Sequence, residues 1–306
     1  MLILPNNAYH HEFSNHLYSI AVPSWHHTRM KPQLQMNKTS IKRLTLYTLV
    51  ALSTLYILTP FLWVVSVSFM HEREATQMHW IPHQPTLQSN ETYFYAHTKS
   101  LDIGTATARQ FPRAIVNSLV IASSVMILNL FFGSLAAYAL ARINFAGKLA
   151  LMLFYLGSRS VPGIAIMIPM YLLVRSYGLL DTHLAVILAH VTFTLPFTIW
   201  ILKGYFQTVP LDLERAARVD GCSQIGALLR VFLPVTTPGM IAVGIFSFIS
   251  SWGEFFFALL FTSTISSKPV TVVASDFAQE LQIDFTVIAA GGVLVVLLPI
   301  ILAFIF

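Results

Sequence analysis

The chain has 306 residues, of which 56% are hydrophobic and only 10% are charged. A soluble domain carries about 25% charged residues, so this composition excludes a water-soluble globule. The formal net charge of +5 does not indicate nucleic-acid binding, and we attribute it to the distribution of basic residues between the loops of a membrane protein. The single cysteine, Cys222, excludes an intramolecular disulfide bond.

Residues 1–37 differ from the rest of the chain because they are rich in His and Asn without a clear periodicity. We expect a disordered tail or a misassigned start, since Met36 precedes a short basic stretch and an apolar run, as at a natural start. The histidines of this tail, among them His10, His11, His26 and His27, specify no ligand geometry, so we predict no metal site there. A cleaved signal peptide is the competing interpretation, but the apolar run is too long and has no Ala-x-Ala site.

Residues 38–306 contain a series of long uncharged runs. A bilayer core of about 30 Å is crossed by roughly 20 apolar residues in a helix. Barrel strands are excluded because they alternate over about 10 residues. We therefore predict an all-α integral membrane protein with six transmembrane helices, the third of which must tolerate Arg159. The predicted helices cover about 44–69, 115–141, 149–174, 184–205, 239–262 and 285–306.

The charged residues predict the orientation, because Lys and Arg collect in cytoplasmic loops. With the N-terminus inside, eleven of the 18 basic residues lie in inner segments and six in outer segments, while Arg159 lies in a helix. Eight of the 13 acidic residues are then outer and four inner, with Glu254 in a helix. We predict that both termini and the loop 206–238 are cytoplasmic, and that the long outer loop 70–113 forms a small cap.

The cytoplasmic loop 206–238 is charged and Ala-rich. Pro210 is expected to stop the fourth membrane helix, with Asp212 as the N-cap of a short new helix and Glu214 in its first turn. Gly221 is expected to end this helix in the left-handed conformation.

A second short helix is predicted to begin at the capping residue Ser223 and to end at Pro234. Two short helices with alanines that permit close approach suit a groove of another protein. An interfacial helix that lies on lipid is the alternative.

This loop resembles the EAA loop of binding-protein-dependent ABC importer permeases, in which Glu-Ala-Ala, three residues, Gly and nine residues precede Ile-x-Leu-Pro. Arg215 departs from the motif, which has Glu there, while Glu214 lies one residue earlier. Val231 replaces the Ile of the motif. The resemblance implies a coupling helix that docks a cytoplasmic ATPase. The implied docking residues are Glu214, Arg215, Ala216, Ala217, Asp220, Gly221, Leu233 and Pro234.

Further stretches resemble the maltose-type second permeases of carbohydrate importers. They are Asn117-Ser118, the run from Ala136 to Arg142, Ile168-Pro169-Met170-Tyr171 and Trp252-Gly253-Glu254-Phe255. The resemblance implies a type I ABC importer permease for a sugar or polyol in a bacterial or archaeal cytoplasmic membrane. Its implied partners are an ATPase dimer, a second permease, an extracytoplasmic solute-binding protein and membrane lipid. Chains of that family usually continue past the sixth helix with a short Gly- and basic-rich tail, whereas this sequence stops at Phe306.

The chain contains no Walker motif G-x-x-x-x-G-K-[ST], so it is not expected to bind ATP itself. We predict a transport subunit without catalytic residues or a cofactor. A permease for a non-sugar solute is the main alternative. An intramembrane enzyme is a further one, although the chain has no G-x-S-x-G, and His71-Glu72-Arg73-Glu74 lacks the second His of a zinc motif.

Candidate residues of the solute path are polar or aromatic groups within the predicted helices. Glu254 is placed to accept sugar hydroxyls beside Trp252, or to pair with a basic group of the partner. Arg159 is either a donor to the sugar or a structural partner of an acid or a carbonyl. His190 and Thr194 line the path or form interhelical hydrogen bonds. The prolines at 162, 169 and 196 are expected to kink their helices.

Overall fold

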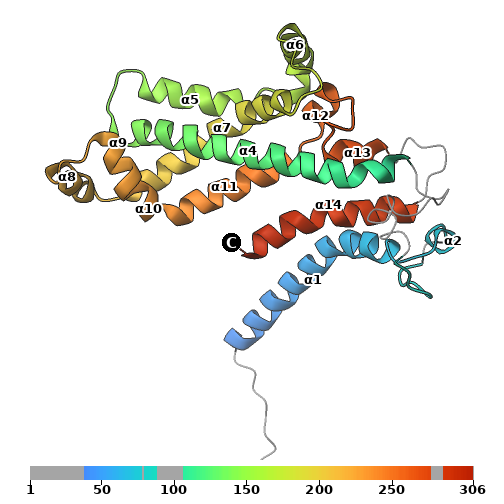
Figure 1. Cartoon of the computed structure of the whole chain (residues 1–306). Helices are drawn as coiled ribbons and strands as arrows, with labels where there is room; N and C mark the ends of the chain where they lie inside the picture. Colours follow the sequence, from blue (N-terminus) through green and yellow to red (C-terminus); the bar gives the residue numbers. More distant parts are fainter. Residues whose placement is uncertain (1–37, 78, 88–105, 277–284, 306) are drawn as a thin grey trace, which may run out of the picture. The chain divides into compact units, whose positions relative to one another are not determined.

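The computed structural model describes residues 38–77, 79–87, 106–276 and 285–305, and every regular element in these ranges is a helix (Figure 1). The predicted tail at 1–37 lies outside the described residues. Residues 1–54 and 55–306 form two units. The first unit contains the beginning of α1 (Lys38–Val67), whose described side chains are exposed along this stretch. The second unit contains the rest of α1 and every other helix of the described residues.

Four helices are long and apolar enough to cross a membrane: α1, α4 (Ala106–Arg142), α7 (His183–Thr208) and α14 (Phe285–Ile305). Two bent helix pairs raise the number to six if each pair is one span. The all-α membrane fold predicted from the apolar runs is therefore confirmed. The short helix α2 (Glu72–Ala75) follows α1.

The third predicted membrane helix is broken in the middle. α5 (Lys148–Ser158) and α6 (Gly163–Ser176) meet at a bend of 96°. Pro162 is extended, with φ −60° and ψ 128°, and a proline disfavours helical backbone at the preceding residue. The prediction of one continuous helix over 149–174 is therefore wrong. Of the three prolines expected to kink helices, Pro162 lies at this break, whereas Pro169 and Pro196 lie inside α6 and α7.

The fifth predicted helix, 239–262, is interrupted as well. α11 (Thr237–Trp252) ends at Gly253, and α12 (Phe256–Phe261) begins after a short break. The carboxylate of Glu254 accepts hydrogen bonds from the backbone N–H groups of Phe257 and Ala258, at 3.1 and 3.3 Å. These amides begin a helix and have no helical acceptor of their own, so Glu254 stabilises the new start. Glu254 was predicted to lie within one helix. It lies instead between α11 and α12 and caps the start of α12.

α4 is the central helix of the second unit, packed along α7 and α11. Buried residues of α4 recur in three clusters, around Trp252 towards one end, around Phe261 in the middle and around Phe232 towards the other end. The helices of the loop 206–238 gather at one end of α4, whereas α12 and α13 (Val270–Asp276) gather at the opposite end (Figure 1). The loop 206–238 and the segment after α11 therefore lie on opposite sides of the helix bundle.

Candidate functional site

The first part of the loop 206–238 is the helix α8 (Leu211–Val219), which follows α7 directly. Its N-cap is Pro210, so the prediction of Asp212 as the cap is wrong and Asp212 lies in the first turn beside Glu214. Pro210 fits there because its backbone needs no N–H partner. Gly221 has φ +86° and ends the helix in the left-handed region as predicted.

The second part of the loop is a short irregular helix. Ser223 accepts a hydrogen bond from the amide of Gly226 at 3.1 Å, which confirms its capping role. The helix continues through α9 (Gln224–Ala227), the π-helical segment η1 (Leu228–Phe232) and α10 (Leu233–Val235). Pro234 was predicted to end this helix, but it lies inside α10, one residue before the last helical residue Val235. The chain instead bends by 84° between α10 and α11.

The predicted docking residues differ in how far they reach solvent. Ala217 is buried against the bundle, whereas Ala216 is exposed. Arg215 is 75% exposed and forms an ion pair with Asp212 at 3.2 Å. Asp220, Gly221 and Pro234 are exposed and Leu233 is half-buried. The loop also exposes apolar side chains, namely Leu211, Leu213, Val219, Ile225 and Leu229.

Glu214 points into the bundle rather than to the outside. Its Oε1 accepts a hydrogen bond from the Tyr138 hydroxyl at 3.1 Å. Its Oε2 lies 3.4 Å from Nε of Arg142, and the two side chains are 13% and 9% exposed. Both partners belong to the end of α4, so Glu214 attaches α8 to this membrane helix.

Arg142 contacts two further elements. Its guanidinium donates to the carbonyl oxygen of Phe206 at 3.0 Å and to that of Val209, at the end of α7. Such carbonyls have no helical donor, so a cation placed here stabilises the helix end. The guanidinium also lies 4.7 Å from the centre of the Phe232 ring in η1. Arg142 thus joins α4, α7, α8 and η1.

Among the candidate path residues, His190 and Glu254 form one polar network. Nε2 of His190 lies 2.9 Å from Oε2 of Glu254, and Nδ1 lies 2.7 Å from Oγ of Ser251. Since Glu254 already accepts two amides, its acceptor role assigns the donor role to His190 Nε2–H. The network ties α7 to the break between α11 and α12.

Thr194 and Trp252 also form contacts between elements. The hydroxyl of Thr194 donates to the carbonyl oxygen of His190 at 2.7 Å and accepts from the amide of Asn129 at 2.6 Å. Trp252 is buried, and its indole N–H donates to the carbonyl oxygen of Val295 at 3.0 Å. The structure therefore gives both residues interhelical contacts, the alternative left open for Thr194.

Arg159 lies apart from this network, in the break between α5 and α6. Its guanidinium lies 4.8 Å from the centre of the Phe197 ring in α7, and the side chain is exposed. Phe197 stacks beside Trp200, which is 47% exposed, with ring centres 5.9 Å apart. A cation and two aromatic faces are thus grouped on α5–α7.

A cleft of about 470 Å³ lies between α4, α11 and α14. Ser123 contributes the polar side chain of its described lining, which is otherwise formed by groups such as Met126, Ile245, Phe248 and Leu302. Sugar hydroxyls would lose their hydrogen bonds to water in such surroundings, so this cleft does not suit a sugar. The described residues contain no group of three or more His, Cys, Asp or Glu that could hold a metal ion.

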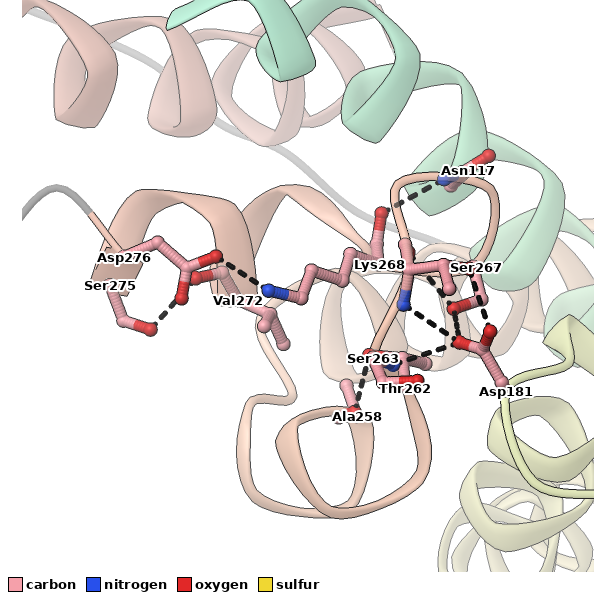
Figure 2. Close-up of polar contacts among 11 residues, drawn as sticks. Asn117, Asp181, Ala258, Thr262, Ser263, Ser267, Lys268, Val272, Ser275 and Asp276 are labelled. Carbon is pink, nitrogen blue, oxygen red and sulfur yellow. Dashed lines mark hydrogen bonds and ion pairs between the residues drawn. The ribbon is translucent and has the colours of Figure 1, made fainter. Parts of the chain in front are cut away.

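At the end of the bundle opposite the loop 206–238, Asp181 organises the turn 262–268 (Figure 2). Its carboxylate accepts the amides of Ser263 and Thr264 at 2.8 and 2.9 Å, and the hydroxyls of Thr264 and Ser267. Burial opposes ionisation, but these hydrogen bonds outweigh it and hold the pKa of Asp181 well below its usual range. Asp181 has φ +61°, a left-handed conformation that Asp tolerates better than most residues.

The same turn is held from its other side by α4. Asn117 donates to the carbonyl oxygens of Ile265 and Lys268, at 3.1 and 2.9 Å. Lys268 in turn forms an ion pair with Asp276 at 2.8 Å (Figure 2).

Comparison with known proteins identifies the family of this chain. The family of binding-protein-dependent transport system inner membrane components matches residues 129–306. The chain belongs to this family. It is a multi-pass inner-membrane permease, and the matched part includes the loop 206–238 and the candidate path residues.

Individual relatives have sugar transport in their names. The trehalose/maltose transport system permease protein MalG of Thermococcus litoralis is 32% identical over 78% of this chain and 82% of the relative. The trehalose transport system permease protein SugB of Mycobacterium tuberculosis is 31% identical, with coverages of 80% and 86%. A crystal structure of a bacterial ABC transporter that imports the acidic polysaccharide alginate has the same fold, with a TM-score of 0.74 and 20% identity over 88% of this chain and 96% of that chain.

Family membership also decides between a permease and the intramembrane enzyme. Such an enzyme would need a Ser/His pair, and Ser251 and His190 form one. The Ser251 side chain is buried at 4% exposure, which leaves a substrate no access to its hydroxyl. In this permease the pair serves as an interhelical brace.

Tyr138 and Arg142 were not predicted to have a functional role. Both belong to the Ala136–Arg142 stretch that was noted for its resemblance. The signal that could have found Arg142 was its charge at the last residue of a membrane helix, close to carbonyl groups that lack donors.

Proposed function

We propose that this permease is one subunit of an ATP-driven sugar or polyol importer, and that the loop 206–238 docks a cytoplasmic ATPase. The observation that carries the proposal is the exposed face of this loop, which presents Ala216, Gly221 and a set of apolar side chains on a site fixed by Glu214. A protein surface of this kind suits a groove in a partner. The sugar-transport names of the relatives support the solute class.

The charge of this face adds a property of the ATPase groove. Since Glu214 is engaged within the permease, the exposed charged groups of the loop are Asp212, Arg215, Arg218, Asp220 and Arg230. Basic groups outnumber acidic ones, so a complementary groove carries acidic residues. Arg215, which replaces the Glu of the motif, belongs to this basic face.

The docking proposal is tested by Ala216→Trp, which places a large ring on the exposed face. The matched control is Ala146→Trp, because Ala146 is also exposed and lies between α4 and α5. We expect Ala216→Trp to reduce co-purification of the ATPase and uptake by tenfold or more, while the control keeps both. Normal ATPase binding and uptake by Ala216→Trp would show that the loop does not dock the ATPase.

The proposed topology places both termini and this loop in the cytoplasm. Cys222, the single cysteine of the chain, is half-buried between α8 and α9 and is a natural reporter. A membrane-impermeant maleimide is expected to label it in inside-out vesicles and in permeabilised cells, but not in intact cells. Labelling in intact cells would place the loop outside and reject the proposal.

For the solute path, the proposal favours Arg159 over the other candidates. α5 has 11 residues, or about 16 Å of helix, so Arg159 lies about halfway through a 30 Å bilayer core. A charged side chain and non-helical backbone at this depth face a water-filled path or protein rather than lipid. The rings of Phe197 and Trp200 beside it can stack on the apolar face of a sugar.

The remaining path candidates support this preference. His190, Thr194, Trp252 and Glu254 already make contacts between helices. We assign them to the walls of the path and the bracing of its helices, with Arg159 as the donor to the solute.

Arg159→Met tests this assignment, with Arg175→Met as the control because Arg175 is an exposed arginine at the end of α6. The expected result for Arg159→Met is a roughly tenfold lower uptake with ATPase binding unchanged, equivalent to the loss of a charged hydrogen bond. Uptake equal to that of the control would remove Arg159 from the path.

A complete importer of this design also needs a second permease and an extracytoplasmic solute-binding protein. The family name includes dependence on a binding protein. In the proposed topology the turn 262–268 faces the outside, and Asp181 and Asn117 fix it while Ser263–Ser266 stay exposed. We assign this preorganised turn to the surface that meets the binding protein.

A further inference from the structure

We propose that Glu214, Arg142 and Tyr138 form the link that transmits movement of α8 to the membrane helices α4 and α7. The inference rests on the proposed docking of an ATPase to the loop 206–238. It assigns to Glu214 a role distinct from docking, since this carboxylate faces the permease and not the partner.

The ion pair between Arg142 and Glu214 is largely buried. Arg142 and Glu214 are 9% and 13% exposed, with 3.4 Å between Nε and Oε2. Two opposite charges at a largely buried site are costly to separate, because each would be left without a partner. The pair therefore attaches α8 to α4 by charge, while the hydrogen bond to Glu214 comes from the Tyr138 hydroxyl of the same helix.

Several structural elements converge on Arg142. The guanidinium holds the carbonyl oxygens of Phe206 and Val209 at the end of α7 and stacks on Phe232 of η1. The phenol of Tyr138 also packs edge-on against Phe232, with ring centres 5.0 Å apart. A displacement of Glu214 is thus applied to two membrane helices at once.

Apart from this link, α8 packs mainly on α9 and η1, which belong to the same loop 206–238. Ala217 is its buried residue, and the helix is otherwise bounded by Pro210 and by Gly221 with its left-handed backbone. A methyl group offers a small contact area, so Ala217 alone can transmit little force. Glu214 is the polar attachment of α8 to the bundle among the described contacts.

The test compares Glu214→Gln with Asp212→Asn in the complete importer reconstituted in proteoliposomes. Both variants remove one negative charge from α8, but Asp212 is 89% exposed and is outside the link. We expect Glu214→Gln to keep ATPase binding and ATP hydrolysis while the solute transported per ATP falls about tenfold, within the usual range of coupling between sites. Asp212→Asn should keep the wild-type ratio.

A milder variant keeps the inference testable if Glu214→Gln does not assemble. Tyr138→Phe removes one hydroxyl and leaves the Arg142–Glu214 pair, so a smaller fall in the ratio, about twofold to fivefold, is expected. An unchanged ratio in the assembled variants would overturn the inference and leave docking intact. Loss of ATPase binding by Glu214→Gln would also overturn it, because Glu214 would then belong to the docking surface. Failure of the docking proposal itself is reported separately, by Ala216→Trp.

Discussion

Glu214 and Asp181 are both acidic residues that organise a loop. Glu214 pairs with Arg142 at the last residue of α4, whereas Asp181 holds the turn 262–268, which Asn117 contacts nearer the start of α4. The helix α8 and the helix α12 before that turn lie towards opposite ends of α4 (Figure 1). Asp181 is held by amides and hydroxyls of one turn, 262–268. Glu214 is held by an arginine and a tyrosine of α4, and that arginine also holds the end of α7. Asp181 therefore fixes the shape of a turn, whereas Glu214 joins separate helices.

This difference suits the topology proposed above, in which the turn 262–268 is outside and the loop 206–238 is in the cytoplasm. A surface that meets a binding protein benefits from a rigid shape, because less conformational freedom is lost on association. A loop that receives movement from an ATPase must pass it to other elements, which requires contacts that cross between helices. The two loops need to be disturbed separately to test this contrast.

The largest effect is expected from Arg142→Ala. The substitution leaves Glu214 largely buried without its cation and removes the donor to the carbonyl oxygens of Phe206 and Val209. Removing one partner of a buried ion pair costs about 3–5 kcal/mol. We expect a clear decrease in the thermal unfolding midpoint of the detergent-purified permease, together with loss of uptake.

The control for this prediction is Arg218→Ala, since Arg218 is an exposed arginine of α8. It should leave the unfolding midpoint within the error of measurement, because exposed substitutions change stability little. Equal unfolding midpoints for Arg142→Ala and the control would show that the contacts of Arg142 at the end of α4 do not stabilise the permease.

A smaller effect is expected from Asp181→Asn. The amide keeps an acceptor oxygen and tolerates the left-handed backbone at φ +61°, but it loses the charge that the amides and hydroxyls stabilise. The expected cost is about 1–2 kcal/mol, since solvent screens part of the interaction. Uptake should fall less than for Arg142→Ala, and ATPase binding should be unchanged.

The pH dependence gives this prediction a sign. The folded-state pKa of Asp181 is lowered from its ordinary value of 3.8. A lowered pKa contributes stability that is fully present above the unfolded value and is lost as the pH falls towards the folded value. The difference in unfolding midpoint between wild type and Asp181→Asn should therefore be constant from about pH 7 to 5 and shrink below about pH 4. A difference that already shrinks between pH 7 and 6 would contradict the lowered pKa.

The helices and their turns could largely be predicted from the sequence, because their causes are local. Apolar runs give the membrane spans, and Gly221 and Ser223 give the turn and cap of the loop. At 159–162 the sequence predicts a kink at Pro162 but not a break of 96°. The break at 253–255 was missed, since an apolar run does not record where Glu254 stabilises a new helix start.

The site was less predictable, because its contacts join residues far apart in the chain. Glu214 was singled out from the motif, but its contact with Arg142 depends on how α8 returns to α4. Asp181 lies in an ordinary connection between two helices, and its role requires the left-handed backbone and the approach of the turn 262–268. Neither contact leaves a signal in local spacing.

The smallest effect is expected from Lys268→Met, in the turn 262–268 that Asp181 holds. Its ion pair with Asp276 is short, at 2.8 Å, but both side chains remain partly exposed, at 20% and 25%. Ion pairs of this kind contribute about 0–1 kcal/mol and weaken further as salt screens them. The turn itself is fixed by the carbonyl oxygen of Lys268 and not by its ammonium group, because Asn117 donates to that oxygen. Lys268→Met should therefore lower the unfolding midpoint slightly at low salt and not at all in about 0.5 M salt. A loss as large as that of Asp181→Asn would mean that the turn 262–268 depends on an ion pair, as the loop 206–238 does, and the contrast between the two loops would no longer hold.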